Sequence, residues 1–162
     1  MISAVDTNIL LDILIPNEEH MKGSKSLLEA YLEKGRLVIC EIVYAELASQ
    51  FASGDELNSF LSETGIRLTG SNEKSLCLAG ERWLHYSKNR SRNISCPKCS
   101  KKVSHLCSYC GAIIPIRQRV LSDFIIGAHA LVQADILLSR DRGIYKTYFS
   151  DLKVISTANE HK

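Results

Sequence analysis

The chain has 162 residues, of which 45% are apolar and 23% are charged, with a formal net charge of +2. This composition is typical of a globular protein with one domain, or one domain and a small module. The longest apolar run is far below the ~18 residues that a membrane-spanning helix needs, so we expect no membrane partner. Asp6, Asn8 and Asp12 interrupt the apolar N-terminal stretch, which also has no basic leader. We therefore expect no secretory signal and a cytoplasmic location.

Short buried strands alternate with helical segments in the first half of the chain. Asp6, Thr7 and Asn8 follow the first strand and favour a helix N-terminus, and Gly35 stands where a helix C-terminal cap is expected. The predicted order is strand 2–5, helix 9–15, helix 20–34, strand 37–40, helix 42–51, helix 56–61, strand 66–68 and a helix from 71 or 72 to about 86.

The composition changes between residues 87 and 116, where Ser, Lys, Arg and Cys are frequent and no long periodic pattern is present. Patterning then resumes with helix 121–132, strand 136–139, helix 143–149 and strand 154–155. Alternating strands and helices predict an α/β fold with a parallel sheet of about five strands.

Charge is distributed unevenly along the chain. Residues 88–119 contain eight basic and no acidic residues, so the remainder holds 12 basic and 18 acidic residues, a balance of −6. Such an asymmetry points to a polyanionic partner, although a solvated basic loop would show the same composition.

Four acids occupy comparable places around the predicted strands. Asp6 directly follows the first strand and Asp141 lies just past the fourth, while Glu46 lies in the helix after the second strand and Asp123 opens the helix before the fourth. Ligands of an open parallel sheet bind beyond the carboxyl ends of its strands. Read singly, Asp6 and Asp123 could cap helices, Glu46 could be an exposed helix residue, and Asp141 could belong to a turn.

Clustered carboxylates repel one another, so they must take up protons or bind cations. Mg²⁺ and Mn²⁺ prefer oxygen ligands. One such metal lowers the pKa of a bound water, and a second stabilises the leaving oxygen of a phosphodiester. Four acids in one cleft therefore suit hydrolysis of a phosphate backbone.

The segments that carry these acids resemble PIN-domain nucleases, including the VapC-type toxins. The resemblance lies in the segments 5–12, 46–47, 123–131 and 137–145, which follow the family order. It implies a three-layer α/β/α fold, an Mg or Mn site formed by the four acids, hydrolysis of RNA, and a homodimer. Asn8 and Ser139 are carried over as polar residues that support the site. The chain departs from the family between about residues 88 and 119, where relatives have much less chain.

This additional segment contains two C-x₂-C pairs seven residues apart, formed by Cys96, Cys99, Cys107 and Cys110. Four thiolates make the closed tetrahedral site of structural zinc, and metal binding would supply the folding energy of so short a segment. Disulfides are the main alternative and an iron–sulfur cluster a smaller one. His105 could replace one of the cysteines.

The zinc would leave no open position for a water, so we expect it to hold basic side chains in place. Lys98, Lys101 and Lys102 would then neutralise phosphates. Tyr109 could stack on a base, but packing against the knuckle is the preferred interpretation. We interpret Cys40, Cys77 and His129 as structural.

These observations predict a discontinuous PIN-like domain, residues 1–87 and 120–162, with a zinc-ribbon insertion at 88–119. We expect a metal-dependent endoribonuclease, either a toxin held inactive by an antitoxin or an RNA-processing enzyme. The alternatives are an RNA-binding or assembly module without nuclease activity, and a structure-specific DNA nuclease.

Overall fold

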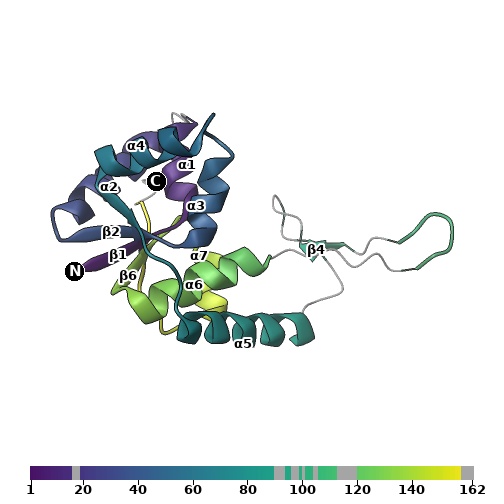
Figure 1. Ribbon diagram of the computed structural model, residues 1–162. Helices are drawn as coiled ribbons and strands as arrows, with labels where there is room; N and C mark the ends of the chain where they lie inside the picture. The colour runs from purple at the N-terminus through teal and green to yellow at the C-terminus, as the bar shows by residue number, and fades with distance from the viewer. Residues whose placement is uncertain are drawn as a thin grey trace.

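A computed structural model describes residues 1–15, 19–89, 94–95, 99, 101–103, 106–112 and 120–157. Its centre is a five-stranded sheet in the order β3-β2-β1-β6-β7 (Figure 1). All four neighbouring strand pairs are parallel, as the alternation of strands and helices predicts. The strands are β1 (Ile2–Val5), β2 (Arg36–Ile39), β3 (Ile66–Leu68), β6 (Ile136–Leu138) and β7 (Val154–Ile155).

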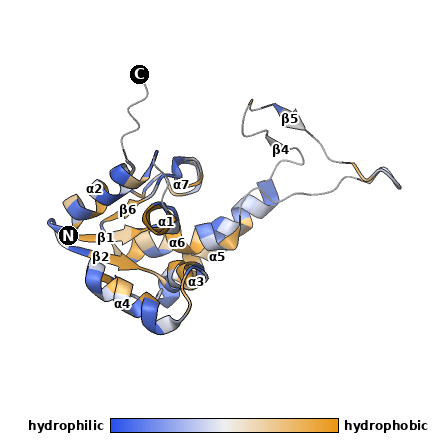
Figure 2. Ribbon diagram, turned by 90° about the horizontal axis from the view of Figure 1, so that it is seen from above, coloured by the Kyte–Doolittle hydropathy of each residue, from blue (hydrophilic) through white to orange (hydrophobic). Residues whose placement is uncertain are grey.

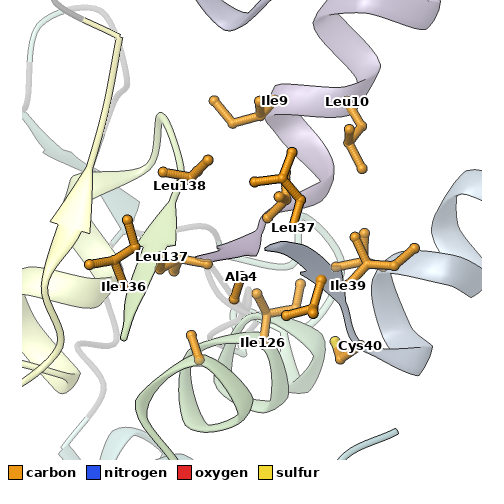
Figure 3. Close-up of a cluster of buried hydrophobic side chains, with 14 of the residues drawn as sticks. Ala4, Ile9, Leu10, Leu37, Ile39, Cys40, Ile126, Ile136, Leu137 and Leu138 are labelled. Atoms are coloured by element: carbon orange, nitrogen blue, oxygen red, sulfur yellow. The ribbon is translucent and has the colours of Figure 1, made fainter. Parts of the chain in front are cut away.

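Helices cover the sheet on both faces and complete the expected α/β/α layers. Figure 3 shows Ile9 and Leu10 of α1 on one side of the sheet and Ile126 of α6 on the other. Helix α2 packs against β2, and α5 packs against α6. The helices are α1 (Thr7–Leu14), α2 (Met21–Leu32), α3 (Glu41–Ala48), α4 (Gly54–Thr64), α5 (Glu73–Asn89), α6 (Leu121–Gln133) and α7 (Arg142–Tyr148).

The central strands are buried on both faces, which explains their largely apolar sequences. Ala4 and Val5 of β1 and all three residues of β6 are at most 3% exposed, and Figure 2 shows β1 and β2 as hydrophobic. No helix in the described part of the chain is long and apolar enough to cross a bilayer.

Aromatic side chains join α5, α6 and α7 on one side of the sheet. The ring of Phe124 lies 5.4 Å from that of Trp83, 5.4 Å from that of Tyr148 and 6.1 Å from that of Phe149. Gly127 allows this close approach, because a Cβ atom there would lie 2.8 Å from Cε2 of Phe149. Helices α6 and α7 are therefore held at a defined separation.

A second, two-stranded antiparallel sheet pairs β4 (Ile94–Ser95) with β5 (Lys102–Val103). Figures 1 and 2 both show β4 away from the central sheet, beyond the end of α5. Helix α5 continues to Asn89, three residues past the predicted end near Tyr86. Cys96, Lys98 and His105 lie outside the described residues.

Candidate active site at the carboxyl ends of the central strands

Strand order reverses between β1 and β6, so the chain segments that leave these two strands diverge and a crevice is expected there. Asp6 is the first residue after β1, and Ser139 is the first after β6. The amide of Asp6 donates to the carbonyl oxygen of Leu138 at 3.0 Å, which continues the strand pairing by one residue. The topology thus brings together side chains that are more than 130 residues apart.

Three side-chain donors converge on one oxygen of the Asp6 carboxylate. Its Oδ2 accepts hydrogen bonds from Oγ of Ser139 at 2.5 Å, from Nδ2 of Asn8 at 2.7 Å and from the hydroxyl of Tyr145 at 3.2 Å. Asp6 occupies the N-cap position of α1, but it makes no capping side-chain hydrogen bond of ordinary geometry. Its carboxylate is directed at this network, and simple helix capping does not explain it.

Ser139 and Asn8 also connect Asp6 to the loop that carries Asp141. The hydroxyl of Ser139 accepts hydrogen bonds from Nδ2 of Asn8 at 3.2 Å and from the amide of Asp141 at 3.1 Å. Oδ1 of Asn8 accepts the amide of Arg140 at 3.0 Å. Both side chains therefore contact the Asp6 carboxylate directly and also bind the backbone of the loop after β6.

The pKa of Asp6 rises from 3.8 to about 6, mainly because the carboxylate is buried, and the nearby charge of Asp123 acts in the same direction. The hydrogen bonds from Ser139 and Tyr145 favour the ionised form but do not offset the burial. Asp6 is only 6% exposed. A carboxylate this poorly compensated favours either a proton or a cation.

Tyr145, at 1% exposure, is a member of this site that sequence reasoning missed. Burial raises its pKa well above the ordinary value, and the charges of Asp6, Asp123 and Asp141 act in the same direction. Its phenol therefore stays protonated and donates its hydrogen bond. The sequence signal was weak, since a tyrosine in an apolar helical pattern is ordinarily a core residue.

Glu46 reaches the site through Thr7, which sequence reasoning noted only as a capping residue. Oγ1 of Thr7 donates to Oε2 of Glu46 in a short hydrogen bond. Thr7 is buried and directly follows Asp6, whereas Glu46 is half-buried. This contact draws α3 toward the start of α1.

Asp123 and Asp141 also act as helix-capping residues. Oδ2 of Asp123 accepts the amide of Val120 at 3.3 Å. Oδ1 of Asp141, the N-cap of α7, accepts the amides of Gly143 at 2.9 Å and Ile144 at 3.4 Å. Within the described ranges, no three His, Cys, Asp or Glu side chains lie close enough together to hold a metal ion as they stand.

A buried aspartate of α1 forms an ion pair with a partly exposed arginine of the loop that follows β6. Nε of Arg140 is 2.8 Å from Oδ2 of Asp12, and Oγ of Ser24 donates to the same oxygen at 2.6 Å. Nε of Arg140 makes no hydrogen bond among the described residues, so its contact with Asp12 is an electrostatic one. It ties α1 to the loop between β6 and α7, which holds Asp6 and Asp141 in register.

His129 lies in the core, in agreement with its interpretation as a structural residue. It is 1% exposed, and its Nδ1 is 3.3 Å from Oγ of Ser71, whose hydroxyl also contacts Glu41 at 3.0 Å. Burial lowers the pKa of His129, and the charge of Glu41 opposes this effect only in part.

Between α5 and α6, Cys107 and Cys110 lie in a tight turn. The backbone amides of Cys110 and Tyr109 donate to the Cys107 sulfur and lower the pKa of its thiol. Gly111 closes the turn with φ 71°, a left-handed conformation that suits glycine. Cys99, Cys107 and Cys110 are free thiols, and Cys96 lies outside the described residues.

The expectation that Tyr109 packs against this turn is wrong. Its side chain is 98% exposed, and Leu106 beside the turn is 59% exposed. The turn is too short to offer a surface that covers a phenol ring, so the ring extends into solvent. Lys101 is also exposed.

Comparison with known proteins agrees with this architecture. The chain is similar in structure to VapBC2 from Rickettsia felis bound to a DNA fragment from their promoter, with TM-score 0.61 and 20% identity over 96% of this chain and 98% of that one. It is also similar to VapBC-1 from nontypeable Haemophilus influenzae, with TM-score 0.60 and 20% identity over 96% and 98% of the two chains.

A third similar structure is FitAcB from Neisseria gonorrhoeae, with TM-score 0.53 and 18% identity over 96% of each chain. At these identities the likeness concerns the fold alone. A comparison with curated proteins found no match. The model of the PIN domain matches residues 4–150, and the chain therefore belongs to the PIN domain family of nucleases.

Proposed function

We propose that this PIN domain is a metal-dependent endoribonuclease whose centre is the carboxylate of Asp6. The observation that carries the proposal is a buried aspartate with a raised pKa, placed where two central strands end. Asp123 and Asp141 lie within electrostatic range of the Tyr145 hydroxyl that binds Asp6, and Glu46 contacts the neighbouring Thr7.

The donor chemistry fits a hard divalent cation. Asp6, Glu46, Asp123 and Asp141 offer only oxygen ligands, and no lysine or arginine among the described residues forms an ion pair with Asp6. These four residues would hold Mg²⁺ or Mn²⁺, which would supply an activated water and stabilise the leaving oxygen. Asn8 and Ser139 would orient Asp6. Asp123 and Asp141 would have to exchange part of their capping role for a ligand role.

The segment 88–119 is proposed to bind the RNA. Its eight basic and no acidic residues favour contacts with phosphates. Lys98, Lys101 and Lys102 are the proposed phosphate contacts. The exposed ring of Tyr109 can stack on an unpaired base, a contact worth about 1–3 kcal/mol per base.

We further propose that Cys96, Cys99, Cys107 and Cys110 bind one structural Zn²⁺, which makes residues 88–119 a zinc-ribbon module. The support is the C-x₂-C pairing and the amide-to-sulfur hydrogen bonds at Cys107, which stabilise a thiolate ready for a metal. Elemental analysis should find about one zinc per chain, and Cys107→Ala should lose it. Protein that has no zinc and two disulfides would contradict the assignment.

A protein partner is the third element of the proposal. A largely apolar groove of about 490 Å³ lies among α1, α2, β2, α4 and β3. Its apolar lining is formed by Ile13, Met21, Leu28, Leu32, Leu37 and Ile66, and Lys25, Glu29, Glu63 and Thr64 complete it. Its shape and lining suit the apolar face of an antitoxin helix, which favours a cytoplasmic toxin over an RNA-processing enzyme. Co-expression with the protein of the adjacent reading frame should yield a complex that Leu32→Glu disrupts, since Leu32 lines the groove and is 43% exposed. Light scattering tests the expected homodimer.

The decisive assay is cleavage of mixed single-stranded RNA with Mg²⁺ or Mn²⁺. Wild type should cut, and Asp6→Asn should bind RNA without cutting, because the change removes one charge and hardly alters shape. Equal cleavage by both proteins would assign the activity elsewhere. Tight RNA binding without cleavage would favour a binding module, and preferential cleavage of structured DNA would favour a DNA nuclease.

Lys101→Ala with Lys102→Ala provides the matched control for this assay. The double variant should weaken RNA binding and reduce its salt dependence by up to about one log-log unit per lost phosphate contact. Cleavage at saturating RNA should persist, since neither lysine belongs to the acidic site. If the double variant binds RNA as wild type does across the salt series, residues 88–119 are not the RNA-binding segment.

A further inference from the structure

The hydroxyl of Tyr145 joins the acidic site from a different element than the other two donors to Asp6. Asn8 and Ser139 lie in the segments that follow β1 and β6, whereas Tyr145 belongs to α7. Asp141 is the N-cap of that same helix, four residues before Tyr145. The hydrogen bond from Tyr145 to Asp6 therefore connects Asp6, at the end of β1, to α7, the helix that begins at Asp141.

The Tyr145 ring is also connected to α6, the helix of Asp123, through the ring of Phe149 at the end of α7. Its ring centre lies 6.2 Å from that of Phe149, and Phe149 lies 6.1 Å from Phe124, the residue after Asp123. Phe149 also lies against Gly127, one turn further along α6. A displacement of Tyr145 would thus be transmitted to both α6 and α7.

All three side-chain donors use Oδ2 of Asp6. A carboxylate oxygen with three donors is restrained in rotation and has little remaining capacity to ligate a cation. Oδ1 is then the oxygen through which Asp6 would meet a metal ion.

We infer that Tyr145 is a positioning residue, which fixes the Asp6 carboxylate so that it offers Oδ1 to the metal and which sets its separation from Asp123 and Asp141. This inference rests on the proposed function of the acidic site. A phenylalanine at position 145 would pack in the same way but could not bind Asp6. The positioning role therefore belongs to the hydroxyl group of Tyr145. Outer residues that orient metal ligands commonly change metal affinity or activity by about 10- to 100-fold.

The test compares Tyr145→Phe with Tyr148→Phe. Tyr148 lies on the same helix and in the same aromatic cluster, and its hydroxyl makes no hydrogen bond within the described part of the chain. Mn²⁺ binding is measured by the loss of the electron paramagnetic resonance signal of the free ion. Cleavage of RNA gives kcat and KM, and near-ultraviolet difference spectra follow the tyrosines as Mn²⁺ is added.

We expect Tyr145→Phe to bind Mn²⁺ about tenfold more weakly and to lose about tenfold in kcat with little change in KM. The Mn²⁺-induced tyrosine difference signal should disappear in Tyr145→Phe and persist in Tyr148→Phe. If Tyr145→Phe keeps the wild-type Mn²⁺ affinity, kcat and tyrosine difference signal, the inference is overturned. If Tyr145→Phe fails to fold, the absence of a tyrosine signal in wild type with bound Mn²⁺ would also overturn it. A wild type that neither binds Mn²⁺ nor cleaves RNA would instead refute the proposed function.

Discussion

Replacing Asp6 by Asn should stabilise the metal-free protein while it abolishes cleavage. Asp6 is 6% exposed, and its pKa rises from 3.8 to about 6 on folding. This difference of about two pKa units corresponds to about 3 kcal/mol at 1.36 kcal/mol per unit, the free energy by which ionised Asp6 opposes folding. The neutral amide of Asn can accept the same hydrogen bonds without that cost. At about 2–4 °C per kcal/mol, Tm should rise by up to roughly 10 °C.

The pH dependence provides a second check on this reasoning. The folded state holds the Asp6 proton more tightly than the unfolded state, so the stability associated with that proton is present below about pH 4. It is lost as the pH rises from about 4 through about 6. The stability difference between Asp6→Asn and wild type should therefore be close to zero at low pH and reach its full value above pH 6.

The assay is urea unfolding in a chelating buffer across this pH range, with Asp12→Asn as the control. Asp12 is equally buried, but Arg140 compensates its charge, so Asp12→Asn should destabilise the protein. Added Mn²⁺ should raise the stability of wild type and leave Asp6→Asn unchanged. The argument would be refuted if Asp6→Asn were no more stable than wild type at pH 8. It would also be refuted if the difference in unfolding free energy between the two proteins did not change with pH.

Three further predictions concern the scaffold. Gly127→Ala should lower stability by about 1–3 kcal/mol in urea unfolding, although Ala favours helices, because its Cβ would overlap Phe149. His129→Gln should flatten the pH dependence of stability between pH 5 and 7. The lowered pKa of His129 means that wild type loses stability as the pH falls below about 6.5, and a steeper profile in the variant would contradict this. Arg140→Met should cost about 1–3 kcal/mol by leaving Asp12 buried without its cation, a loss that Asp12→Asn in the same chain should partly reverse.

Local patterns were sufficient to predict the main elements of this protein. Short, largely apolar runs predicted β1, β2 and β6, and apolar residues at helical spacing predicted α2 and α6. Both signals work because side chains become buried with the period of the strand or helix that carries them. The alternation of strands and helices correctly indicated an all-parallel sheet of five strands. Asp6 and Asp141 could be placed at the carboxyl end of that sheet for the same reason.

Only the tertiary structure decided how these acids are held. The convergence of Asn8, Ser139 and Tyr145 on one oxygen of Asp6 depends on the pairing of β1 with β6 and on the packing of α7. The raised pKa of Asp6 depends on burial by distant segments. Hydrophobic periodicity is a local property and records which face of an element is buried, whereas strand order and helix packing determine which side chains meet there. The exposure of Tyr109 likewise depends on which segments pack around it, and the local sequence does not determine this.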